Sequence, residues 1–191
     1  MNDRQAEKKF YSISNILIIL ESLFPSEFSS LKEEFFKMLA FDAFIGAPDR
    51  HAMNWGILAP VTTDEAPVRF APIFDTARGL FREISDDDLR KKDRKQGRRQ
   101  FLEKYAERSR PIISAGQAIQ QNHFELVKWV FECGEIKHRQ AMRTVFDAVE
   151  INLIEHLLQR YFRRIITQYR IEFIIDLLSY RIQQIRTEYK P

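Results

Sequence analysis

Three oxygen-bearing side chains stand out in the first half of this chain, where a helix-like sequence gives way to polar residues. Asp49 and Asn54 lie five residues apart, just after the helix-breaking residues Gly46 and Pro48. A second carboxylate, Asp75, follows a later strand-like stretch. A loop that leads into a strand can turn the first two side chains toward one point, and a paired return strand would bring Asp75 beside Asn54.

The chemistry that these groups favour is metal-assisted phosphoryl transfer. An amide oxygen and a carboxylate suit Mg²⁺, which takes few protein ligands and completes its octahedron with water and phosphate oxygens. We therefore expect Asn54 and Asp75 to hold Mg²⁺ against the phosphates of a nucleotide. Asp49 would orient a hydroxyl and accept its proton. A lone Asp in a loop is often only a cap or turn former, so the prediction depends on all three residues together.

Neighbouring residues have predicted roles of their own. His51 belongs to the same catalytic loop, and we expect it to support the loop geometry by hydrogen bonding rather than to act as a second base. Trp55, Ile57 and Ile73 are candidates for the floor of a nucleotide pocket, although apolar residues on short strands more often belong to the core. The other histidines show no ligand spacing with Cys133, so no zinc site is expected.

The elements that must position these residues are mostly helical. Only 6 Gly and 7 Pro occur among 191 residues, which favours helix over a many-stranded sandwich. Apolar residues at intervals of three and four predict a first helix from Phe10 to Leu23, closed by Pro25. A second helix is expected to start from a Ser26 cap and to run to Ile45.

A small hairpin and a charged segment follow. Trp55 to Leu58 and Val68 to Ala71 predict two strands, joined by a polar turn at 62–65. Part of the charged segment from Ser85 to Arg110 is expected to be a mobile loop. Its basic run, Arg90 to Arg99, is most simply a solvated surface, but it leaves open a phosphorylated, acidic or nucleic-acid partner.

The remainder, over 100–190, predicts a bundle of helices. Asn122 and Glu125 form a capping-box pattern for a helix that stops at Gly134. Two longer helices are expected, roughly Ile136 to Tyr161 and Ile171 to Tyr189. The predicted fold class is therefore mainly α with one small β-hairpin, in a single domain over 1–191.

Composition limits the partners and the compartment. The 30 basic and 27 acidic residues give a net charge of only +3, so direct binding to nucleic acid is not expected from the overall charge. The single Cys133 cannot form an intramolecular disulfide, which fits a reducing cytoplasm. No apolar run is long enough to span a bilayer, so a soluble protein without membrane attachment is expected.

Two motifs carry a family resemblance. The first is Asp49-Arg50-His51-x-x-Asn54, and the second is Ala71-Pro72-Ile73-Phe74-Asp75. Together they resemble the catalytic loop and the metal motif of HipA-like kinases, the serine/threonine kinases of bacterial toxin–antitoxin modules. Phosphoinositide kinases also carry the first motif, but Pro-Ile-Phe-Asp followed by Ala-Arg-Gly-Leu is closer to the HipA-like pattern. The resemblance covers mainly Phe35 to Leu80.

The resemblance implies a helical kinase C-terminal lobe that transfers the γ-phosphate of ATP to Ser or Thr of a protein. Asp49 then matches the catalytic base, and Asn54 and Asp75 match the metal ligands. A complete kinase also needs an N-terminal lobe with a phosphate-covering loop and an ATP-pairing lysine. The residues before the first motif predict two helices and contain no Gly-rich loop, so that lobe is not expected in this chain. The implied partners are a protein substrate, an antitoxin and a separate N-lobe protein.

Two alternatives remain open. The first is a non-catalytic, pseudokinase-like interaction module that keeps the motifs as structure. The second is a phosphoinositide or small-molecule kinase, because such enzymes share the first motif.

Overall fold

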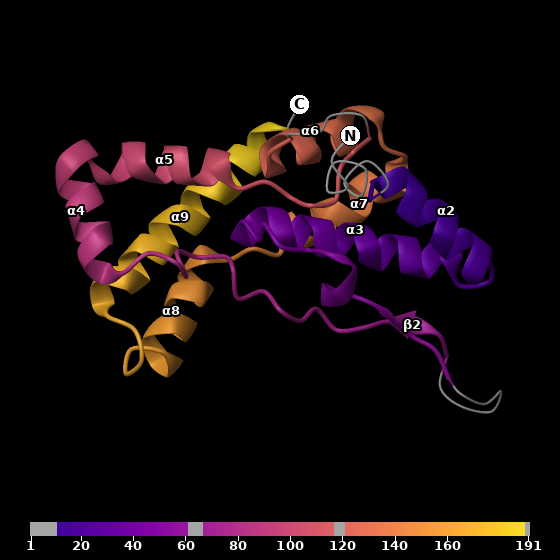
Figure 1. The fold of residues 1–191 in the computed structure, drawn as a ribbon, viewed down its shortest axis with the longest axis horizontal. Helices are drawn as coiled ribbons and strands as arrows, with labels where there is room; N and C mark the ends of the chain where they lie inside the picture. Colours follow the sequence, from indigo (N-terminus) through magenta and orange to yellow (C-terminus); the bar gives the residue numbers. More distant parts are fainter. Residues whose placement is uncertain (1–10, 61–66, 117–120, 190–191) are drawn as a thin grey trace, which may run out of the picture.

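A computed structural model describes residues 11–60, 67–116 and 121–189 (Figure 1). These residues are mainly helical with one small antiparallel sheet, so the predicted fold class is confirmed. The helices are α2 (Ile13–Leu23), α3 (Phe28–Ile45), α4 (Asp86–Gln96), α5 (Arg98–Arg108), α6 (His123–Cys133), α7 (Ile136–Asp147), α8 (Ile151–Tyr161) and α9 (Gln168–Thr187), with a 3₁₀ turn η1 (Ala52–Asn54). None of the described helices is long and apolar enough to cross a membrane.

Helix α3 lies at the centre of the core. It packs against α7 most extensively and also contacts α2, α6, α9 and the hairpin (Figure 1). Its side chains Phe35, Phe36 and Leu39 are almost fully buried, and each large apolar side chain removed from water in this way stabilises the fold by roughly 1.5–3 kcal/mol. The C-terminal end of this helix is therefore a firm support for the loop that follows it.

The predicted hairpin is confirmed, although its strands are shorter than expected. Strand β1 (Ile57–Leu58) pairs antiparallel with β2 (Arg69–Phe70), with Ile57 opposite Phe70. The predicted turn at 62–65 lies outside the described residues. The Trp55 ring stacks on Phe70 with centroids 5.5 Å apart and also packs against Phe35 of α3. Trp55 and Ile57 are partly buried and pack against the hydrophobic core.

The first two helices agree with the prediction except at one cap. Helix α2 ends at Leu23, two residues before Pro25, as expected, and its predicted beginning at Phe10 lies outside the described residues. Helix α3 begins at Phe28 with Glu27 in the cap position, and no side chain caps it. The expectation that Ser26 caps this helix was therefore wrong.

The charged segment after the second motif is helical over Asp86–Gln96 and Arg98–Arg108, so the prediction that part of it is a mobile loop was wrong for these residues. Ser85 caps α4 by accepting a hydrogen bond from the amide of Asp88 at 3.2 Å. Three aspartates occupy the first turn of α4, and Arg94 and Lys95 lie in its last turn. Negative charges at the start of a helix and positive charges at its end interact favourably with the helix dipole. The same charges that suggested a loop therefore stabilise a helix.

The C-terminal half contains one further correction. The single helix predicted from Ile136 to Tyr161 is two helices, because the backbone turns between Asp147 and Ile151. Arg186 of α9 donates hydrogen bonds to the carbonyl oxygens of Phe146 and Val149 in this turn. The last helix begins at Gln168, slightly before the predicted start, and ends at Thr187. The capping box at Asn122 and Glu125 and the stop at Gly134 are confirmed.

Candidate functional site

The first motif begins where α3 ends. Gly46 closes the helix in the left-handed conformation, with a φ of 69°. The chain then reverses and runs back beside α3 toward the hairpin (Figure 1). A residue with a side chain would be strained at this φ, so Gly46 allows the sharp turn that places Asp49 and Asn54 at the edge of the core.

Arg50 links the two motifs. Its Nε and Nη2 atoms donate to the two carboxylate oxygens of Asp42 at 2.8 and 2.7 Å, and both side chains are buried. Its Nη1 atom donates to the carbonyl oxygens of Asn54 at 2.5 Å and of Phe74 at 2.7 Å. One guanidinium therefore fixes the loop of the first motif, the residue before Asp75 and helix α3 to one another.

Burial and ion pairing act in opposite directions on the pKa of each member of this pair. Burial raises the pKa of the Asp42 carboxyl, and the hydrogen bonds and charge of Arg50 oppose that rise. Burial alone would lower the pKa of Arg50, but the hydrogen bond and charge of Asp42, together with the nearby charge of Asp75, raise it above its usual value. The two hydrogen bonds from the guanidinium to the Asp42 carboxylate are the paired geometry in which an Arg–carboxylate contact is strongest.

Asp49 lies at the surface end of this network. Its carboxylate is partly exposed and accepts a hydrogen bond from Nη1 of Arg78 at 3.1 Å. Arg78 is half-exposed and also contacts Glu83 at 3.4 Å. The candidate base is thus accessible, and among the described residues its ion-pair partner is a half-exposed side chain rather than a buried group.

Asn54 is nearly fully buried. Its Nδ2 atom donates to the backbone oxygen of Asp49 at 2.7 Å. Because the amide nitrogen is held in this way, the oxygen of the same amide group points away from that bond. His51 has a structural contact of the kind expected, since its Nδ1 atom accepts a hydrogen bond from the amide of Met53 at 3.2 Å and caps η1.

The second motif has strained backbone at its acidic residue. Asp75 is exposed and has a φ of 50°, a conformation that costs a non-glycine residue of order 1–3 kcal/mol. Such a strained conformation persists only where the surrounding structure holds the backbone in place. Here Arg50 donates to the carbonyl oxygen of Phe74, the residue directly before Asp75. Ile73 and Phe74 are 40% and 45% exposed. Ile73, unlike Trp55, is therefore available to a ligand or a partner.

Hydrogen bonds link the backbones of Asp49, Asn54 and Phe74, the residue before Asp75. Asn54 and Phe74 share Arg50, and Asn54 also binds the backbone of Asp49. Sequence reasoning missed two members of this arrangement, Asp42 and Arg78. Asp42 lies inside the apolar pattern of α3, and a polar residue buried in a helix is the signal that could have identified it.

A second buried arginine, Arg181, holds the end of helix α3 from which the site begins. Arg181 of α9 is 1% exposed and donates to the carbonyl oxygens of Ala43, Phe44 and Ala106. The first two carbonyls belong to the last turn of α3, where a cation is favoured by the helix dipole. Burial lowers the pKa of Arg181 to about 10, which still leaves it charged at neutral pH.

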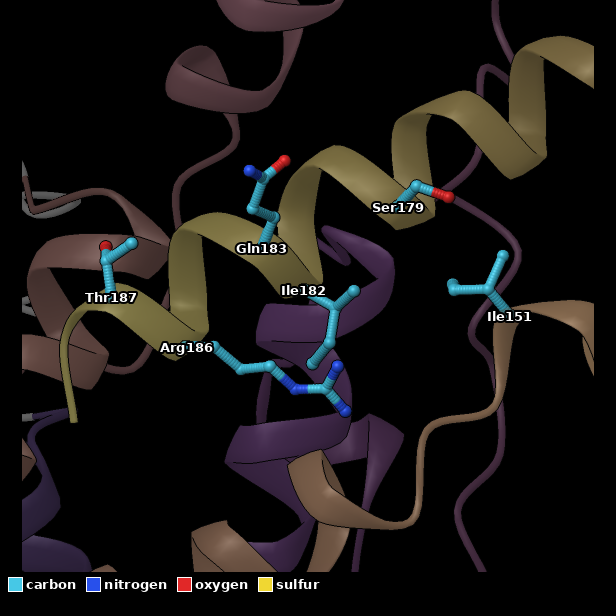
Figure 2. A pocket seen from close by; sticks show the side chains of 6 residues that line it. All are labelled: Ile151, Ser179, Ile182, Gln183, Arg186 and Thr187. Atoms are coloured by element: carbon cyan, nitrogen blue, oxygen red, sulfur yellow. The ribbon is translucent and has the colours of Figure 1, made fainter. Parts of the chain in front are cut away.

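A separate pocket of about 480 Å³ lies on α9, beside the start of α8 (Figure 2). Its labelled side chains include Ile182, Gln183 and Arg186, and the Arg186 guanidinium is already bound to backbone oxygens. None of the residues predicted for catalysis or metal binding lines this pocket. It is therefore distinct from the candidate site.

Comparisons with known proteins agree with the motifs. A family model described as the HipA-like C-terminal domain matches residues 1–157. Among solved structures, the fold resembles the crystal structure of a Helicobacter pylori proinflammatory kinase, CtkA, with a TM-score of 0.75 and 19% sequence identity. The match covers 94% of this chain and 61% of that one, so this chain spans less than two thirds of the kinase's length. No curated protein sequence matches the chain.

Proposed function

Because the chain belongs to the family of HipA-like C-terminal domains, we propose that this kinase-related lobe transfers the γ-phosphate of ATP to a Ser or Thr hydroxyl of a protein. The observation that carries the proposal is the bridge made by Arg50. It holds the backbone of Asn54 and the residue before Asp75 on one nitrogen. In phosphoryl transfer, where catalysis is mostly positioning and charge stabilisation, such a fixed arrangement is what the chemistry requires.

Each candidate residue has a role in this proposal. Asp49, accessible at the edge of the site, would orient the acceptor hydroxyl and take its proton as the oxygen attacks. His51 would hold the loop through its bond to Met53, without taking part in proton transfer. Ile73, exposed beside the second motif, would contact the nucleotide. These assignments stay predictions until the variants below are measured.

The residues present fit a magnesium ion. The amide oxygen of Asn54 and the exposed carboxylate of Asp75 are hard oxygen donors, and Mg²⁺ needs only one or two protein ligands when phosphates and water supply the rest. When bound, the ion would offset the negative charge of the phosphates. The described residues contain no cluster of three or more His, Cys, Asp or Glu side chains that could hold a metal by themselves, so we expect metal affinity to depend on the nucleotide.

A second polypeptide segment would complete the enzyme. The described residues before the first motif form α2 and α3, and Lys32 and Lys37 lie on helix α3 rather than on a strand, so neither is placed like the ATP-pairing lysine of a kinase. Met53, Leu58 and Phe74 are 81%, 44% and 45% exposed around the hairpin and the second motif. Large apolar groups exposed together favour coverage by another surface, and we propose a separate N-lobe there. An antitoxin is a further proposed partner.

Titration with Mg²⁺–ATP tests the proposal. We expect calorimetry of the whole chain to show binding that EDTA abolishes and that Asp75→Ala weakens at least tenfold, because one of two metal ligands is lost. Asp87→Asn is the matched control, since Asp87 is an exposed aspartate on α4 that belongs to neither motif. Equal binding by wild type and Asp75→Ala would contradict the metal assignment.

An acceptor panel separates the remaining alternatives. With radiolabelled ATP and a supplied N-lobe, labelling of protein would support the proposal, and labelling of inositol lipids would favour the lipid-kinase alternative. An absence of both nucleotide binding and labelling would favour a non-catalytic module.

A further inference from the structure

A basic cleft of about 650 Å³ lies beside the candidate site, between the loop that follows α3 and the helices α4 and α5. Its volume is within the usual range for ligand pockets. Ile84, Phe101 and Tyr105 supply apolar surface, and Gly46 and Pro48 form the edge next to Asp49. Five cationic side chains line it against the single acidic Glu83, and these are Arg78, Lys92, Lys95, Lys104 and Arg108.

Most of these cations are not neutralised within the protein. In the described residues, Lys95, Lys104 and Arg108 have no carboxylate within ion-pair distance, and Lys92 contacts only the face of the Phe101 ring, at 5.7 Å. Glu83 is already shared with Arg78. Like charges gathered in a cleft repel one another and raise the local concentration of anions. The cleft is therefore suited to a negatively charged ligand.

The cleft is continuous with the candidate base. Arg78 lines it and also binds the Asp49 carboxylate at 3.1 Å, and Pro48 is the neighbour of Asp49 in sequence. An extended peptide advances about 3.3–3.6 Å per residue. A peptide whose hydroxyl lies at Asp49 would thus bring residues only a few positions away over the cationic side chains.

The arrangement of the basic run argues against nucleic acid. Its cations do not form one continuous stripe, because Arg98 is bound to Asp176 at 2.8 Å and Arg90 lies on the Tyr169 ring. Single-stranded nucleic acids also need exposed aromatic rings for stacking. In the cleft, Phe101 is only 5% exposed and the Tyr105 hydroxyl accepts the amide of Phe81. A cleft with cationic side chains but no exposed ring for base stacking is better suited to carboxylates than to nucleic acid.

From these observations we propose that the cleft binds an acidic segment of the protein substrate, close in sequence to the hydroxyl that is phosphorylated. The proposal rests on the proposed kinase function for the identity of the ligand, but binding itself requires neither ATP nor metal. It assigns part of the basic run, Lys92 and Lys95, to substrate recognition and leaves the rest of the run to the protein surface.

The test measures peptide binding by fluorescence anisotropy without ATP. The probe is a labelled peptide with one serine followed by several Asp and Glu residues, and its partner has Asn and Gln at those positions. We expect the acidic peptide to bind, its affinity to fall with salt, and the neutral peptide to bind at least tenfold more weakly. The variant Lys92→Gln/Lys95→Gln/Lys104→Gln should lose at least tenfold in affinity for the acidic peptide.

The control variant is Lys91→Gln/Arg94→Gln/Arg99→Gln. It removes the same charge from exposed positions of α4 and α5 that do not line the cleft, so it should bind the acidic peptide as wild type does. Equal losses in both variants, or equal binding of both peptides, would overturn the proposal. Tight binding of a labelled single-stranded oligonucleotide that only the cleft variant loses would also overturn it. Loss of Mg²⁺–ATP binding with peptide binding intact would instead count against the kinase function alone.

Discussion

At the scale of single residues, Arg50 has the most contacts with both motifs. Its guanidinium donates to the buried carboxylate of Asp42 and to the backbone oxygens of Asn54 and Phe74. The geometry of the candidate site therefore depends on a residue that takes no part in the proposed chemistry. A planar guanidinium is needed for this combination, because the ammonium of lysine cannot make the paired contacts with Asp42.

Replacing Arg50 should destabilise the protein strongly. In Arg50→Ala the Asp42 carboxylate stays buried without its partner, which costs about 3–5 kcal/mol for pairs of this kind. Urea unfolding followed by circular dichroism measures the loss. Arg82→Ala, at an exposed position in the following segment, is the control and should change the free energy of unfolding by less than about 0.5 kcal/mol. A similar small effect for both variants would show that the pair does not stabilise the fold.

The residues of the motifs could be identified from the sequence, but their supports could not. Asp49, Asn54 and Asp75 were recognisable because residue type and order are visible in a linear chain. The pairing of Arg50 with Asp42 was not, because the helix ends at Ile45 between them, so their spacing in sequence does not reveal that the two side chains meet. The contact of Arg78 with Asp49 depends on how the chain returns from the hairpin, and no local pattern encodes that path.

At the scale of elements, the end of α3 decides where the loop of the first motif begins. Gly46 turns the chain in the left-handed region, and Arg181 caps the last carbonyl oxygens of the helix from the opposite side. The two features are coupled, since a Cβ atom at Gly46 would lie 3.0 Å from Nη1 of Arg181. The loop is thus set by α9 as well as by α3, although these elements are far apart in sequence.

Gly46→Ala should reveal this coupling. The left-handed backbone costs an alanine about 1–2 kcal/mol, and contact with the confined Arg181 side chain adds to it. Gly56→Ala is the matched control, because no atom lies within 4 Å of a Cβ built there and its φ is ordinary, so its stability should be unchanged or slightly raised. Thermal unfolding compares the two, and a higher melting temperature for Gly46→Ala than for Gly56→Ala would contradict the explanation.

Sequence patterns predicted elements well where caps and apolar spacing agreed, as at the capping box of α6 and the end of α2. They failed where charge was taken as a sign of disorder. In α4 only Leu89 is buried, so its apolar face is too narrow to recognise. Its stability instead comes from the cap, the charge order and contacts such as the bond from Arg170 of α9 to Asp86 at 2.6 Å.

At the scale of the whole molecule, buried ionisable groups make stability sensitive to pH. His123 lies at the first turn of α6 and is completely buried. Burial and the neighbouring charge of Arg181 lower the pKa of His123 well below its usual value of 6.5. Burial also lowers the pKa of His138. Both side chains are neutral in the folded protein but take up protons in the unfolded chain as the pH falls below about 6.5.

Folding stability should therefore be complete above pH 6.5 and should fall as the solution becomes more acidic. Each such histidine contributes a slope of up to about 1.4 kcal/mol per pH unit, because the unfolded state binds the additional proton. Urea unfolding between pH 7.5 and 5.5 measures this change. His123→Leu should reduce the slope relative to wild type while His156→Leu, at an exposed position of α8, should leave it the same. An unaltered slope in His123→Leu would exclude this histidine as the cause.

The only cysteine of the chain, Cys133, is exposed at the end of α6. A maleimide dye or a nitroxide spin label will therefore attach at one known position without any mutagenesis. Energy transfer or electron spin resonance from this label can then follow the binding of the proposed N-lobe protein to the unmutated chain.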